Sequence, residues 1–165
     1  MCTEGRVRGL FLSFIFLLLT GCVSAPVFEE TPDINLSLKP MDVRDTHEAH
    51  LGQRVIWGGH IVKTENLADS TRIEIMAYPL DSSQYPDRDE EALGRFMLIH
   101  KGFLEPLTYA EGRTLTVLGK IEEKHIGKVG QSDYAYPVVV EEQHKLWPEG
   151  GPPRTFFHFG IGISL

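Results

Sequence analysis

The segment RVIWGGHIV, residues 54–62, carries large apolar side chains on both of the faces that a β-strand would present. A strand of this kind is covered on both sides or curls inside a small barrel. Two glycines in its middle, Gly58 and Gly59, predict a bulge or a close approach of a second backbone. This segment therefore restricts the chain to folds in which other structure surrounds a strand. Its apolar residues are Val55, Trp57 and Ile61 on one face and Ile56 and Val62 on the other.

Four further segments have the alternation and the residue types of strands. The first alternates isoleucines with charged residues, and Pro79 ends it or places it at a sheet edge. Residues 42–50 predict one short helix that ends before Gly52, a residue type that favours a left-handed cap. The combination predicts a mainly β fold, a small antiparallel β-barrel with one short helix, and the five-stranded OB-type barrel is one candidate. The four segments are 71–80, 94–100, 113–123 and 134–147.

The N-terminal region has the layout of a secretory signal, with a basic start and a short apolar run from Leu10 onward. The run is too short to cross a bilayer as a helix, which disfavours an uncleaved anchor. The run ends in Leu19, Thr20, Gly21 and Cys22, a pattern similar to a bacterial lipobox. An incidental cysteine beside an ordinary cleavage site is the weaker alternative. We expect cleavage before Cys22 and acylation of its thiol and amino groups by diacylglycerol and an N-acyl chain; no other cofactor is expected.

The rest of the chain suits a single domain behind a linker. Prolines at 26, 32 and 40 predict a tether with polyproline character, and a fully extended tether would reach roughly 50 Å. We expect its later part, Ile34 to Leu38, to lie partly on the domain surface. The predicted parts are a lipoprotein signal peptide (1–21), a tether (22–40), a β-barrel domain (41–150) and a C-terminal strand or tail (151–165).

The C-terminal segment FFHFGIGISL places five apolar side chains on one face of a strand, opposite small or polar residues. The favoured interpretation is that this strand closes or covers the sheet of its own chain. The alternative is a donor strand that adds to the sheet edge of a partner or rests on a membrane surface. The apolar residues are Phe157, Phe159, Ile161, Ile163 and Leu165.

The charge and the cysteine content argue against nucleic-acid binding and against a disulfide. The formal net charge of −7 disfavours binding to nucleic acid, because affinity for phosphate backbones depends on an excess of Lys and Arg. Cys2 would leave with the signal and Cys22 would carry lipid. The mature domain would then depend on packing alone, without a disulfide.

The sequence offers no recognisable catalytic or metal-binding motif. His47, Glu48 and His50 have the spacing H-E-x-H, whereas the zinc hydrolase motif needs H-E-x-x-H. The other histidines are scattered, so we predict structural histidines and no metal site. The paired carboxylates at 122–123 and 141–142 would point to opposite strand faces and are predicted to be solvated strand ends. We therefore expect no catalytic residue and no enzyme activity.

Aromatic residues and an arginine beside a glycine provide one possible ligand surface. In a small barrel they could line a groove for a peptide, a glycan or a lipid. The competing interpretation is that the aromatic residues fill the core and the arginine makes structural hydrogen bonds. The residues are Trp57, Tyr78, Arg95 and Tyr109.

Several motifs together resemble the Slp family, the starvation-inducible outer-membrane lipoproteins of Gram-negative bacteria. They are the lipobox, RVIWGGHIVKTEN (54–66), T-x-x-E-I (71–75), YPLDSS (78–83), GRFM (94–97), GFLEPLTYAEGRTLTVLGKI (102–121), YAYPVVV (134–140) and LWP (146–148). One departure is Glu105, where the family pattern would have Asp; the charge is kept.

This resemblance implies a protein anchored by lipid to the periplasmic face of the outer membrane. Val23 follows the lipidated cysteine, whereas an aspartate there would favour retention in the inner membrane. The family supplies no catalytic residues, and Cys22 is the one functional residue that the resemblance transfers. We expect a non-enzymatic, stress-related structural or interaction module, with membrane lipid and other envelope proteins as partners. The alternative is a periplasmic module that binds a small ligand in an aromatic groove.

Overall fold

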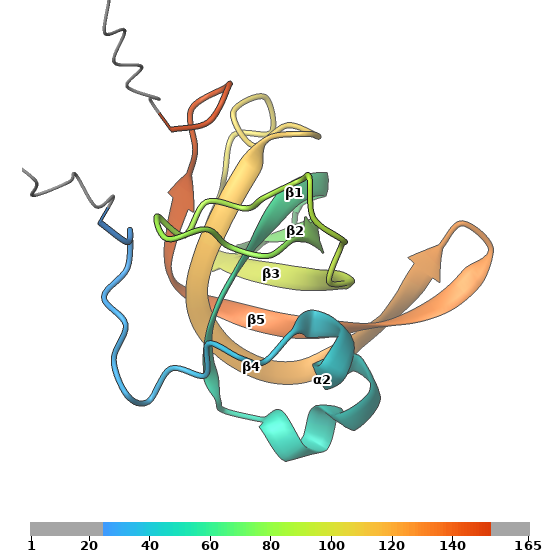
Figure 1. Ribbon diagram of the computed structural model, residues 1–165. Helices are drawn as coiled ribbons and strands as arrows, with labels where there is room; N and C mark the ends of the chain where they lie inside the picture. The colour runs from blue at the N-terminus through green and yellow to red at the C-terminus, as the bar shows by residue number, and fades with distance from the viewer. Residues whose placement is uncertain (1–24, 153–165) are drawn as a thin grey trace, which may run out of the picture.

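Five strands form the body of the protein in the computed structural model, which describes residues 25–152 (Figure 1). The predicted signal peptide, Cys22 and most of the C-terminal segment lie outside the described residues. The elements are α2 (Pro40–Thr46), a 3-10 turn η1 (His47–His50), β1 (Arg54–Asn66), β2 (Ser70–Ala77), β3 (Arg95–Lys101), β4 (Thr114–Val129) and β5 (Ser132–Leu146).

The strands close into a barrel in the order β1-β2-β3-β5-β4. Four neighbouring pairs are antiparallel, and β3 pairs with β5 in parallel. The predicted fold class, a mainly β OB-type barrel with one short helix, is confirmed. The parallel pair is a detail that strand patterns do not reveal, because periodicity carries no information on direction.

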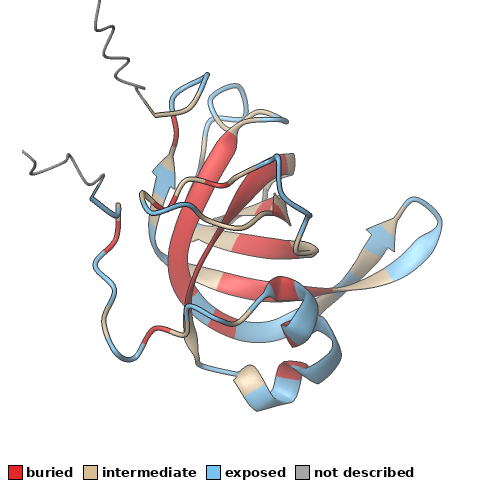
Figure 2. Cartoon of the chain, in the orientation of Figure 1, coloured by how far each residue is buried: buried red, intermediate tan, exposed pale blue. Residues whose placement is uncertain are grey.

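Side chains from all five strands fill the inside of the barrel and form the core. Figure 2 shows the buried stretches along the strands of the barrel. In β2, residues alternate between buried and partly buried, as the sequence pattern predicts. The indole of Trp57 meets the ring of Phe96 edge-on with centroids 5.3 Å apart, and both side chains are buried. Burial of one such aromatic side chain stabilises the fold by roughly 1.5–3 kcal/mol. The close approach predicted at Gly59 is confirmed, since a Cβ there would lie 1.9 Å from the carbonyl oxygen of Met76.

The predicted helix begins two residues early, at Pro40, and changes to a 3-10 turn at His47. Proline suits the first helical position because its missing N–H has no partner there in any helix. Val43 is fully buried and joins the barrel core, so the helix covers one end of the barrel. Gly52 has φ of +77°, the left-handed conformation predicted for the end of this segment.

Much of the predicted tether packs against the barrel. We call residues 27–38 the strap. Phe28 and Ile34 are buried in a cluster with side chains of β1 and β4 on the outer face of the barrel. The amide of Gln84 holds both backbone groups of Phe28, with Oε1 2.8 Å from the backbone nitrogen and Nε2 3.0 Å from the carbonyl oxygen. The expected contact of residues 34–38 with the domain surface is therefore present at Ile34, and the packing begins earlier, at Phe28.

Beyond the barrel, β4 and β5 continue as a two-stranded arm, residues 125–136 (Figure 1). The strands pair up to Val129 and Ser132, and Gly130 makes the turn with φ of +61°. Ile126 on this arm is 60% exposed. Among the described residues, no helix is long and apolar enough to span a membrane.

Candidate functional site

The four residues predicted to form a ligand surface lie in three different places. Trp57 and Tyr78 line a cavity of about 550 Å³ beside the strap. Leu36 and Leu93 also line this cavity. Arg95 lies on the outside of the sheet and forms an ion pair with Glu74. Tyr109 lies at one end of the barrel interior. The structure therefore does not bring the four residues into one groove.

Trp57 is largely a core residue. Its ring is buried, and its indole N–H donates to the carbonyl oxygen of Leu38 at 2.7 Å. That bond fixes the strap over the barrel at this point. Tyr78 is partly buried, and its ring meets His60 edge-on at 5.5 Å. Of these two aromatic residues, only the partly buried Tyr78 therefore offers its ring to a ligand in the cavity.

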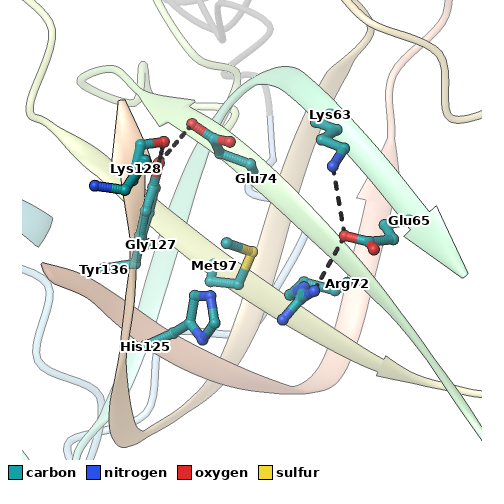
Figure 3. Close-up of a pocket in the computed structure, with 9 residues that line it drawn as sticks. All are labelled: Lys63, Glu65, Arg72, Glu74, Met97, His125, Gly127, Lys128 and Tyr136. Carbon is teal, nitrogen blue, oxygen red and sulfur yellow. Dashed lines mark hydrogen bonds and ion pairs between the residues drawn. The ribbon is translucent and has the colours of Figure 1, made fainter. Parts of the chain in front are cut away.

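A second hollow lies between the outer face of the sheet and the arm, and we call it the arm groove (Figure 3). Its volume is about 180 Å³. The sheet contributes Lys63, Glu65 and Arg72, and Glu65 accepts ion pairs from both cations at 3.5 and 3.0 Å. These paired charges give the groove a polar floor, and the arm supplies an aromatic wall.

Tyr136 joins the arm to this floor. Its hydroxyl donates to Glu74 at 3.1 Å (Figure 3). The same carboxylate binds the guanidinium of Arg95. Burial and the neighbouring carboxylate of Glu74 raise the pKa of the Tyr136 phenol. The hydroxyl therefore remains a proton donor at neutral pH and helps to set the angle of the arm.

Three ionisable side chains converge at the end of the barrel where β3 and β5 run in parallel. Nδ1 of His100 lies 2.8 Å from one carboxylate oxygen of Glu141, and Nδ1 of His144 lies 2.7 Å from the other. The hydroxyl of Tyr109 lies 2.7 Å from Nε2 of His144. We call His100, Glu141 and His144 the His–Glu–His cluster, and Tyr109 borders it.

A β-bulge explains why Glu141 and His144 meet. On β4, Leu118 and Gly119 are consecutive, but their partners on β5 are Gln143 and Glu141, so Glu142 is the extra residue. The bulge resets the alternation, and both Glu141 and His144 turn toward the barrel interior. A Cβ at Gly119 would lie 2.4 Å from the carbonyl oxygen of Val140, so glycine permits this crossing.

The prediction that Glu141 is a solvated strand end is wrong, since its side chain is only 11% exposed. Burial raises the pKa of this carboxyl, but the hydrogen bonds from His144 and His100 outweigh it, and the net pKa lies below the ordinary value. Sequence reasoning missed the cluster because it assumed unbroken alternation along β5. The glycine at 119, within an apolar strand, was the one available signal of a bulge.

Together, these features define a small OB-type barrel that is held by an N-terminal strap and carries an open groove and an internal ionisable cluster. Its relatives place this barrel among bacterial envelope proteins. The outer membrane lipoprotein Slp family matches residues 19–159, and the protein belongs to that family. Its location is accordingly the outer membrane.

Individual relatives are similar over most of this chain. An uncharacterised protein of Haemophilus influenzae is 34% identical over 149 residues, covering 87% of this chain and 78% of the relative. In Escherichia coli, the uncharacterised lipoprotein YeaY is 31% identical (86% of this chain, 72% of the relative), and the outer membrane protein Slp is 28% identical (85% and 74%). Among solved structures, a small single-stranded DNA-binding protein from Streptomyces coelicolor is similar with a TM-score of 0.40 and 16% identity, covering 61% of this chain and 97% of that one.

Proposed function

We propose that this protein is a non-enzymatic, stress-related interaction module, anchored by lipid on Cys22 to the periplasmic face of the outer membrane. The observation that carries the interaction role is the arm groove, an open hollow beside an arm that projects beyond the barrel. Its floor is polar, and the ring of Tyr136 on the arm forms an aromatic wall. Family membership and the lipobox support the anchor.

The strap determines how far the barrel can lie from the membrane. Since Gln84 holds Phe28 against the barrel, the six residues from Cys22 to Val27 separate a lipid on Cys22 from this attachment point. Fully extended, that stretch spans at most about 20 Å. We therefore propose that the barrel works close to the lipid surface rather than deep in the periplasm.

The anchor is tested by intact-mass analysis of protein extracted from membranes, beside a Cys22→Ser variant. We expect the wild-type mass to equal a chain starting at Cys22 plus diacylglycerol and one N-acyl chain. We expect the variant to fractionate with soluble protein. An unacylated wild-type mass, or identical fractionation of the two proteins, would contradict the proposed anchor.

The interaction role is tested with a photo-crosslinking residue placed at Ile126 in living cells. The control position is Leu107, which is 86% exposed and lies outside the arm. Discrete crosslinked species specific to Ile126 would support an envelope partner at the arm. The same pattern from both positions, or none from Ile126 under starvation and growth alike, would count against this role.

The cavity beside the strap favours a second candidate, a module that binds a small apolar ligand such as a lipid. Its volume of about 550 Å³ falls in the usual range for ligand sites. The test is native mass spectrometry with fatty acids for the wild type, Tyr78→Ala and the control Tyr85→Ala. Binding that is lost only in Tyr78→Ala would support the cavity, and equal binding by all three proteins would exclude it.

A further inference from the structure

The His–Glu–His cluster has the ligand chemistry of a metal site. Two imidazoles and one carboxylate are the donor set of several three-ligand zinc sites. One ligand atom from each of His100, Glu141 and His144 lies within 4.8 Å of the other two. Two of these residues come from β5 and the third from β3, so the barrel itself holds their spacing.

The hydrogen bonds show how an ion would fit. Each Nδ1–H points at a different oxygen of Glu141, at 2.8 Å for His100 and 2.7 Å for His144. Zn²⁺ binds nitrogen at 2.0–2.1 Å, so neighbouring ligands of a tetrahedral ion lie about 3.3 Å apart. An ion that replaces both Nδ1 protons therefore requires only small movements of the two rings.

Tyr109 provides outer support of the kind that metal-binding histidines use. Its hydroxyl lies 2.7 Å from Nε2 of His144, the ring nitrogen that faces away from Glu141. With Nδ1 bound to an ion, Nε2 would carry the ring proton and donate a hydrogen bond to this hydroxyl. Such partners fix the ring and the tautomer of a ligand, and their loss commonly weakens metal binding 10- to 100-fold.

We propose that His100, Glu141 and His144 bind one divalent transition metal ion, and that Zn²⁺ is the ion this ligand set favours. This proposal replaces the expectation of structural histidines without a metal. The side chains of the two histidines are 22% and 18% exposed, so an ion can reach the site from solvent. The site is independent of the arm groove and of the lipid anchor.

The test uses the mature lipoprotein in detergent, freed of metal with a chelator and then dialysed. Zn²⁺ binding is measured by equilibrium dialysis, and Co²⁺ serves as a spectroscopic probe of the ligand geometry. We expect one saturable site per chain and a melting temperature that rises with Zn²⁺ concentration, because only the folded state binds. The variants are His100→Gln, Glu141→Gln and His144→Gln, and the matched control is His125→Gln on the arm.

We expect each of the three variants to lose at least about 100-fold in Zn²⁺ affinity and to lose the Co²⁺ absorption, while His125→Gln binds as the wild type does. Circular dichroism establishes that each variant is folded. If Glu141→Gln does not fold, His100→Gln, the most exposed member, decides the question. A wild type without a saturable site, or folded variants that bind unchanged, would overturn the proposal and leave a purely hydrogen-bonded cluster.

Discussion

Nδ1 of His144 lies 2.7 Å from a carboxylate oxygen of Glu141, although the two residues are three apart on one strand. In a regular strand, residues at this spacing point to opposite faces. The β-bulge at Glu142 places both side chains inside the barrel, and Gly119 on the neighbouring strand makes room for it. The geometry of the cluster therefore depends on one glycine of the neighbouring strand, which pairs with Glu141.

Replacing Gly119 by alanine should destabilise the fold. The new Cβ would meet the carbonyl oxygen of Val140 at 2.4 Å, and backbone atoms cannot move aside as the end of a side chain can. We expect a loss of about 1–3 kcal/mol in the free energy of unfolding, measured by urea denaturation. Lys120→Ala, an exposed change at the next position, is the control and should cost under about 0.5 kcal/mol. Equal midpoints for the two variants would contradict the crowding argument.

His60 should make the fold less stable in mild acid. Its ring is buried, and burial lowers its pKa more than the hydrogen bond to Gly112 raises it. Because the folded-state pKa lies below the unfolded value near 6.5, the unfolded chain binds a proton first as the pH falls. Stability should therefore decline below about pH 6.5 and level off once the pH is below the folded-state pKa.

The measurement for His60 is the urea midpoint at pH 7.5 and pH 5 for the wild type and His60→Gln. Glutamine keeps a hydrogen-bond donor but has no charge to gain. The variant should lose less stability between the two pH values than the wild type. If both proteins lose the same amount, His60 is not the residue responsible.

Gln84 should control the attachment of the strap. Its buried amide makes both hydrogen bonds to the backbone of Phe28, and Gln84→Ala removes both. A buried N–H left without a partner costs about 1–3 kcal/mol, so we expect the strap to open locally while the barrel stays folded. Hydrogen exchange at the Phe28 amide should be faster in this variant and unchanged in the exposed control Gln143→Ala. Protection of Phe28 that survives Gln84→Ala would show that apolar packing alone holds the strap.

Asp33 should titrate at a lower pH than an ordinary aspartate. The hydroxyl of Thr31 and the guanidinium of Arg54 lower the pKa of this carboxyl to about 2. The contribution of this charge to stability is therefore present above the unfolded pKa of 3.8 and is lost as the pH falls through about 2. A carbon NMR titration should give a midpoint near 2, and Thr31→Ala should raise it. A midpoint unchanged in Thr31→Ala, as expected for the control Ser37→Ala, would contradict the assigned cause.

The placement of Trp57 illustrates how far pattern reasoning carries. The apolar faces of residues 54–62 predict a strand enclosed by a barrel, and the structure confirms this for β1. The aromatic character of Trp57 also suggested a ligand-binding residue, with core packing as the competing interpretation. Its burial beneath the strap depends on residues near 38 that have no periodicity of their own. Local sequence therefore predicts the strand but does not specify what covers it.

The sequence by itself determined the mainly β class and the family, because these depend on alternation and short motifs, and it predicts a secretory and lipidation signal. Only the tertiary structure decided the parallel pairing of β3 with β5, the attachment of the strap and the meeting of His100, Glu141 and His144. Each of these joins residues that are distant in the chain or separated by a bulge. A single inserted residue reverses which face a side chain occupies, and the energy that selects it comes from packing against the opposite strand.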